Sequence, residues 1–178
     1  MSIEQLAKQG RDRLYGGLAS APSARLRQMR DSALRSCFIR MEETPGRMEH
    51  VATIHGKEYI NDAAAASVNA TLYTMQSLSG PLVWIAFADD KATDYSPLRP
   101  LVLRKVGMLI CVGDRNENLH KAFDTLVPAI AYAKSIADAV SLADRCPIDY
   151  AKVVLSPATS GNVAGETGRQ FVYQVNEL

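Results

Sequence analysis

A short and uninterrupted apolar run, Leu82-Val83-Trp84-Ile85-Ala86, constrains the fold of this chain more than any other feature. A strand with one face in water alternates apolar and polar residues, whereas a strand covered on both faces is apolar throughout. Strands of the second kind belong to parallel sheets, whose neighbouring strands are connected by crossovers that usually contain a helix. The run therefore predicts a parallel sheet with helices on both faces.

Further strand-like runs occur from Glu49 onward, and turns and helical stretches separate most of them. Two short runs flank Gly56, and four more follow, which we expect to be buried. The expected strands are His50–His55, Glu58–Ile60, Leu82–Phe87, Met108–Val112, Ile130–Lys134 and Val153–Leu155. The expected helices are Ser67–Leu78, Pro97–Lys105, Asn116–Leu126, Ser135–Arg145, with Asn116 and Ser135 as N-caps, and a last one ending near Glu177. This order predicts an α/β fold with a doubly wound, mostly parallel sheet.

The first 40 residues differ in charge from the rest. Residues 1–40 hold eight Lys or Arg and three Asp or Glu, a net charge of +5, whereas residues 41–178 hold twelve and sixteen, a net charge of −4. Two helices are expected at residues 2–17 and 22–39. A basic helix could contact nucleic acid or a membrane, but no interleaved aromatic residues support this, so packing through its apolar stripe is favoured. We expect a basic, helical N-terminal extension at 1–40 and an α/β domain at 41–178.

Several functional classes are not supported. No apolar run approaches the roughly 20 residues that span a bilayer, and the first residues do not resemble a signal peptide, so a cytoplasmic protein is expected. The three cysteines and three histidines show no disulfide or metal-ligand spacing, so no metal is expected. Phosphate-loop, dinucleotide-binding and nucleophile-elbow motifs are absent, which leaves autonomous nucleotide binding and nucleophilic catalysis without support.

Ligands of such sheets bind in the loops that follow the carboxyl ends of the strands. These loops are Asn61–Ser67, Ala88–Ser96, Gly113–Asn116 and Ser156–Gly168. Lys91 lies among carboxylates in the second loop, where it either neutralises a carboxylate or phosphate or forms ion pairs in a surface turn. The loop that begins at Ser156 offers hydroxyls and glycine N–H groups to an anion, although a plain turn fits it nearly as well.

Several segments together resemble one family in order and spacing: Arg47-Met48-Glu49, Tyr59-Ile60-Asn61-Asp62, Val68-Asn69-Ala70-Thr71, Trp84-Ile85, Asp90-Lys91, Asp94-Tyr95-Ser96 and Val154-Leu155-Ser156-Pro157-Ala158. From about residue 40 to residue 178 the chain resembles the C-terminal, Rossmann-like domain of Mur ligases, and most of all the MurD type. Those enzymes join D-glutamate to UDP-N-acetylmuramoyl-alanine with ATP and magnesium through an acyl phosphate. The resemblance implies that Arg47 and Asp62 contact the nucleotide, and that Lys91 and Ser156 hold the carboxylates of the incoming amino acid.

The chain also departs from the family pattern. After Asn61-Asp62 the family has Ser-Lys-Ala-Thr-Asn, whereas this chain has Ala63-Ala64-Ala65-Ala66-Ser67 and so loses a lysine and a threonine that contact the amino acid and product. The family's phenylalanine that packs on the substrate is missing from the loop around Gly161-Asn162-Val163. The uridine-binding and ATPase domains have no counterpart in residues 1–40.

These observations favour a non-catalytic binding or regulatory module related to peptidoglycan precursor synthesis, with no catalytic residue and no cofactor of its own. Its expected partner is another protein or a second copy, contacted through the N-terminal helices, rather than nucleic acid or membrane. One alternative is a component of a split ligase, for which a separate ATPase part would supply ATP and magnesium. Another is a degenerate ligase fragment without activity.

Overall fold

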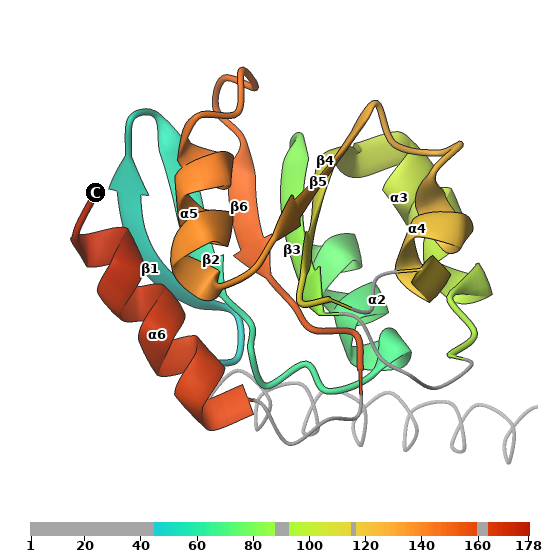
Figure 1. Ribbon diagram of the computed structural model, residues 1–178, viewed down its shortest axis with the longest axis horizontal. Coiled ribbons are helices and arrows are strands. Elements are labelled where there is room, and N and C mark those ends of the chain that lie inside the picture. The colour runs from blue at the N-terminus through green and yellow to red at the C-terminus, as the bar shows by residue number, and fades with distance from the viewer. Residues whose placement is uncertain (1–44, 88–92, 115–116, 160–163) are drawn as a thin grey trace, which may run out of the picture. The chain divides into compact units, whose positions relative to one another are not determined.

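A single six-stranded sheet forms the centre of the α/β domain (Figure 1). The computed structural model describes residues 45–87, 93–114, 117–159 and 164–178, which belong to the second of two units, Thr44–Leu178. The strands are β1 (Glu49–Ile54), β2 (Lys57–Asn61), β3 (Leu82–Phe87), β4 (Val106–Val112), β5 (Ala129–Ala133) and β6 (Lys152–Leu155). Their order is β1-β2-β6-β3-β4-β5, and among these described strands only β1 and β2 pair antiparallel. The predicted mostly parallel sheet is confirmed.

Helices connect the parallel strands. The connecting helices are α2 (Val68–Ser77), α3 (Arg99–Lys105), which follows a 3₁₀ turn at Ser96–Leu98, α4 (Glu117–Phe123) and α5 (Ile136–Asp144), and α6 (Ala164–Asn176) follows the last strand. The hydroxyls of Ser67 and Ser135 cap α2 and α5, each accepting a hydrogen bond at 3.1 Å from the amide three residues on. The predicted N-cap at Ser135 is confirmed, whereas Asn116 lies outside the described residues. The five helices lie close to the stretches where the sequence predicts them.

The strand β3 shows why its sequence is apolar at every position. Trp84 faces the core that α2, α3 and α4 cover, whereas Ile85 faces the core under α5 and α6, and both are fully buried. Figure 1 shows the two groups of helices on opposite sides of the sheet. Trp84 and Phe123 of α4 form a T-shaped pair with ring centroids 5.4 Å apart. The sheet is therefore doubly wound, as predicted.

The path of the chain creates a switch point in the sheet. From β3 the chain adds β4 and β5 on one side and then returns to insert β6 on the other side, between β2 and β3. The chain leads from β3 to α3 and from β6 to α6, on opposite faces of the sheet, and doubly wound folds bind ligands at such a point. The carboxyl ends of β2, β6 and β3 are adjacent there: the amide of Asp62 donates to the carbonyl of Leu155 at 2.9 Å, and that of Phe87 to the carbonyl of Pro157 at 3.4 Å.

One predicted strand differs from its expected environment. The run Ile130–Lys134 was expected to be buried, but within the described part of the chain the corresponding strand β5 is at the edge of the sheet and pairs only with β4. Its Tyr132 side chain is 54% exposed, although Ala133 is buried. A short apolar run does not distinguish a central from an edge strand, because that depends on strand order.

Among the described helices none is both long and apolar enough to cross a membrane.

Candidate functional site

A buried polar cluster lies at the carboxyl ends of two adjacent strands. Asp62 follows β2 and Ser156 follows β6, and both side chains are fully buried. Arg47, which precedes β1, donates from Nη1 to Asp62 Oδ1 at 2.5 Å and is only 4% exposed. The same carboxylate accepts hydrogen bonds from Ser156 Oγ at 3.0 Å, Thr74 Oγ1 at 2.5 Å and the amide of Met48 at 3.2 Å. We call Arg47, Asp62, Thr71, Thr74 and Ser156 the Asp62 cluster.

Helix α2 supplies the other members of the cluster. Its Thr71 and Thr74 lie one turn apart on the face that meets the sheet, and Thr71 Oγ1 is 2.8 Å from Ser156 Oγ. Arg47 Nη2 donates to the carbonyl of Ala70 at 3.1 Å, and its guanidinium lies 5.8 Å from the ring centroid of Tyr73. The cluster therefore ties the start of β1, helix α2 and the loop after β6 to one another.

Burial and the neighbouring donors have opposite effects on the pKa of Asp62. Burial raises the pKa of the Asp62 carboxyl, while the Arg47 guanidinium and the hydrogen bonds from Thr74, Ser156 and Met48 act to lower it. A charge in this position is retained only because it is paired and hydrogen-bonded. Within the described part of the chain, Arg47 Nε is the one polar atom of this cluster that is buried without a partner.

Three of the four predicted ligand-binding residues meet in this cluster. The resemblance assigned Arg47 and Asp62 to a nucleotide and Ser156 to an amino acid, yet Arg47 and Ser156 both donate to the carboxylate of Asp62. Lys91, the fourth, lies outside the described residues. Their predicted contacts with a nucleotide and an amino acid stay predictions. Thr71 and Thr74 were not assigned a role from the sequence, although two hydroxyls three positions apart on the inner face of a helix indicate a buried polar partner.

The loop after Asp62, here called the alanine loop (residues 63–66), has a defined conformation. The amide of Ala63 donates to Asn61 Oδ1 at 3.2 Å, and the amide of Ala64 donates to the carbonyl of Gly46 at 3.0 Å. Ala65 and Ala63 are fully buried, whereas Ala64 is half-buried and Ala66 is exposed. The two positions that face outward thus present only methyl groups.

A cavity of about 620 Å³ lies beside the alanine loop, between the start of β1 and helix α6. Gly168 forms part of its wall and packs so closely on the loop that a Cβ atom there would be 3.1 Å from Ala63 Cβ. Its polar lining includes Glu49, Asn61 and Arg169, and Tyr173 adds an aromatic ring that is 61% exposed. The volume and the mixture of polar and apolar groups are typical of sites for small molecules.

Comparisons with known proteins connect this geometry to a family of enzymes. The chain is 37% identical over 158 residues to the UDP-N-acetylmuramoylalanine–D-glutamate ligase of Porphyromonas gingivalis, covering 89% of this chain and 35% of that protein. It is 34% identical to the ligase of the same name from Christiangramia forsetii, covering 100% of this chain and 41% of that protein. This chain thus spans well under half the length of these relatives. No family model matches the sequence.

A solved structure supports the fold alone. The crystal structure of folylpolyglutamate synthase from Thermotoga maritima superimposes with a TM-score of 0.52 at 16% sequence identity. The superposition covers 73% of this chain and 31% of that protein. Its α/β architecture agrees with the sheet and helices described above.

Proposed function

We propose that the domain of this chain is a non-catalytic binding or regulatory module. The premise is that the chain is related to the MurD-type ligases of peptidoglycan precursor synthesis and has the α/β fold of the Mur ligase C-terminal domain. The observation that carries this proposal is the alanine loop. Its backbone is held in place by hydrogen bonds, yet its outward side chains cannot bind a charged substrate.

The loss at this loop is large in energetic terms. The resemblance places a lysine at Ala64 and a threonine at Ala66, and both would contact the amino acid. A hydrogen bond to a charged group is worth about 1.5–3 kcal/mol, and each 1.4 kcal/mol changes affinity about tenfold. Removing both contacts is therefore expected to weaken amino-acid binding by roughly a hundredfold or more.

The Asp62 cluster stabilises the fold around the alanine loop, and in this proposal it supplies no catalytic group. The Asp62 carboxylate has four hydrogen-bond donors within the domain, and the hydroxyl of Ser156 contacts both Asp62 and Thr71. These side chains are buried and bonded to one another, so they stabilise the ends of β2 and β6. A domain whose fold is stabilised in this way, but whose alanine loop lacks polar side chains, is suited to a binding role rather than to catalysis.

One observation favours a second candidate function, a component of a split ligase. Arg47, Asp62 and Ser156 are retained at positions that the resemblance assigns to ligands, in addition to their contacts within the domain. In that case ATP and magnesium would be held by a separate ATPase part, and residues 1–40 would serve as its docking arm. The two candidates differ in whether the chain contributes to product formation.

A ligation assay separates the candidates. The purified chain is incubated with ATP, magnesium, UDP-N-acetylmuramoyl-alanine and D-glutamate, first alone and then with a MurD-type relative truncated to lack its own C-terminal domain. ADP release and product mass are followed, and the full-length relative is the positive control. We expect no product in either mixture. Product above that of a Lys91→Ala variant would contradict the proposal, and product only in the second mixture would establish the split ligase.

A graft tests the alanine loop directly. Ala64→Lys and Ala66→Thr are combined, because neither position is fully buried and the fold should tolerate both changes. We expect the double variant to bind D-glutamate at least about tenfold more tightly than the natural chain in a calorimetric titration. Equal affinities would show that the alanine loop is not the cause of lost binding.

Residues 1–40 are expected to mediate contact with a partner or a second copy. Deleting residues 1–35 should therefore change either the solubility or the mass measured by light scattering. An unchanged mass and solubility would remove this part of the proposal.

A further inference from the structure

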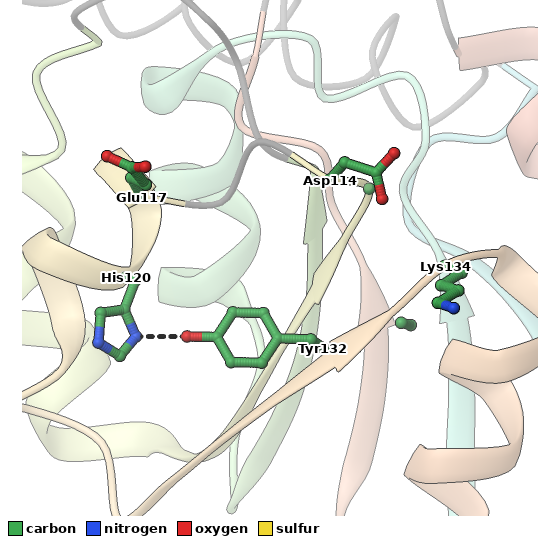
Figure 2. A pocket seen from close by; sticks show the side chains of 7 residues that line it. Asp114, Glu117, His120, Tyr132 and Lys134 are labelled. Carbon is green, nitrogen blue, oxygen red and sulfur yellow. Dashed lines mark hydrogen bonds between the residues drawn. The ribbon is translucent and has the colours of Figure 1, made fainter.

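A second cavity, of about 420 Å³, lies at the carboxyl ends of β4 and β5 (Figure 2). Strands β6 and β3 separate these ends from the end of β2, where the alanine loop begins. Gly113 and Asp114 after β4, helix α4 and the end of β5 line the cavity, and the polar side chains there are Asp114, Glu117, His120, Tyr132 and Lys134. None of these residues belongs to the Asp62 cluster or to the positions assigned by resemblance.

An anchored aromatic ring forms the middle of this cavity. Tyr132 is 54% exposed although it is a large ring on an edge strand. Its hydroxyl is 2.6 Å from His120 Nδ1, and the two ring centroids are 6.1 Å apart. The hydrogen bond holds the ring in place, so it offers a fixed apolar surface to a ligand (Figure 2).

Charged side chains surround this ring and are available to a ligand. Within the described part of the chain, Asp114 and Lys134 have no hydrogen-bond or ion-pair partner, and both are exposed. Glu117 has only an exposed contact with Lys121, at 3.6 Å on the same helix, which is worth little in water. In Figure 2, Asp114 and Lys134 lie to one side of Tyr132, and Glu117 and His120 lie to the other.

This arrangement has the charge pattern of a specific class of molecule. Two carboxylates and one ammonium line the cavity and together carry a net charge of −1. An amino acid with a cationic side chain has two ammonium groups and one carboxylate, and therefore the opposite pattern and a net charge of +1. We propose that the cavity binds such an amino acid, with its α-ammonium and carboxylate at Asp114 and Lys134 and its distal ammonium at Glu117.

The cavity also has room for the aliphatic part of the amino acid, which joins its two charged ends. The aliphatic part of the side chain lies over the Tyr132 ring, where apolar contact and attraction between a cation and the ring both contribute. The volume of about 420 Å³ lies within the range of small-molecule sites. This site does not depend on the proposed non-catalytic role, because it shares no residue with the alanine loop.

Titration of the full chain with L-lysine tests the proposal. Amide resonances of residues 113–114 and 117–134 are followed by NMR, and we expect saturable shifts confined to this region. L-norleucine lacks only the distal ammonium and should bind about tenfold more weakly, while L-glutamate should give no saturable shift. No saturation with L-lysine, or equal affinity for L-norleucine, would overturn the proposal.

Substitutions identify the groups that bind. Asp114→Asn and Lys134→Met are each expected to weaken L-lysine binding by about tenfold. Both residues are exposed, and the unperturbed resonances of the core report that each variant is folded. Asp149→Asn removes the same charge at an exposed position in the loop between α5 and β6 and should leave the affinity unchanged. Equal losses in Asp149→Asn and Asp114→Asn would reveal unspecific electrostatic attraction and contradict the assignment.

Discussion

Ser156 donates a hydrogen bond to Asp62 with an Oγ–Oδ2 distance of 3.0 Å, although 94 positions separate the two residues along the chain. Their meeting follows from the register of β2 and β6, in which Asn61 pairs with Leu155, so that each residue is the first one beyond a paired position. Both are fully buried, so neither can exchange its partner for water. The contact therefore stabilises the carboxyl ends of β2 and β6.

Replacing Ser156 by alanine should destabilise the domain. Asp62 loses one donor and the hydroxyl of Thr71 loses its partner, so we expect the free energy of unfolding to fall by about 1–3 kcal/mol. Urea denaturation followed by circular dichroism measures this change. Ser77→Ala removes an exposed hydroxyl from α2 and should change stability by less than about 0.5 kcal/mol. Equal effects of the two substitutions would contradict the role given to Ser156.

The buried pair of Arg47 and Asp62 should show strong coupling. Arg47→Met or Asp62→Asn alone leaves the other charge buried without its partner, which typically costs about 3–5 kcal/mol. The double variant should lose less than the sum of the two single losses, because it no longer buries an isolated charge. A double-mutant cycle of denaturation free energies measures the difference. Additive losses would show that the two side chains act independently.

Two glycines of α6 should respond in opposite directions to the same substitution. A Cβ at Gly168 would lie 3.1 Å from Ala63 and 3.2 Å from the Asn61 amide, whereas a Cβ at Gly165 would have no atom within 4 Å. We expect Gly168→Ala to destabilise the domain by about 1–3 kcal/mol through overpacking. Gly165→Ala should leave stability unchanged or raise it by about 0.5 kcal/mol, because alanine favours the helix. Thermal unfolding compares them, and a destabilised Gly165→Ala would refute the assignment.

Stability should depend on pH through Asp144 at the end of α5. The hydrogen bond from His55, at 2.9 Å, is the main cause that lowers the pKa of Asp144 below its ordinary value of 3.8. The unfolded chain then takes up this proton at higher pH than the folded chain, so stability from Asp144 is present above pH 3.8 and is lost as the pH falls through the folded-state pKa.

Asp144→Asn tests this expectation. The urea midpoint of the natural chain should exceed that of the variant at pH 6, and the difference should shrink as the pH falls below 3.8. Asp149→Asn, which changes an exposed carboxylate without a described partner, serves as the reference for general charge effects. A difference between the natural chain and Asp144→Asn that stayed constant over this pH range would disprove the linkage.

The sequence by itself determined most of the elements of this protein. Leu82–Phe87 coincides with β3, and the cap of α5 is at Ser135 as expected. These features are readable because apolar runs, helical spacing and capping depend on neighbours in the chain. The replacement of polar residues in the alanine loop was also visible from sequence, but only through the resemblance, because it is a departure from the family's pattern.

Only the tertiary structure decided which residues meet. The insertion of β6 between β2 and β3 brings Ser156 to Asp62, and the place of β5 at the edge exposes Tyr132 to a cavity. Neither arrangement follows from local patterns, because both result from strand order and from contacts between residues far apart in the chain. For the same reason the sequence showed that Arg47, Asp62 and Ser156 were retained, but the packed sheet alone showed that Arg47 and Ser156 both bind the Asp62 carboxylate.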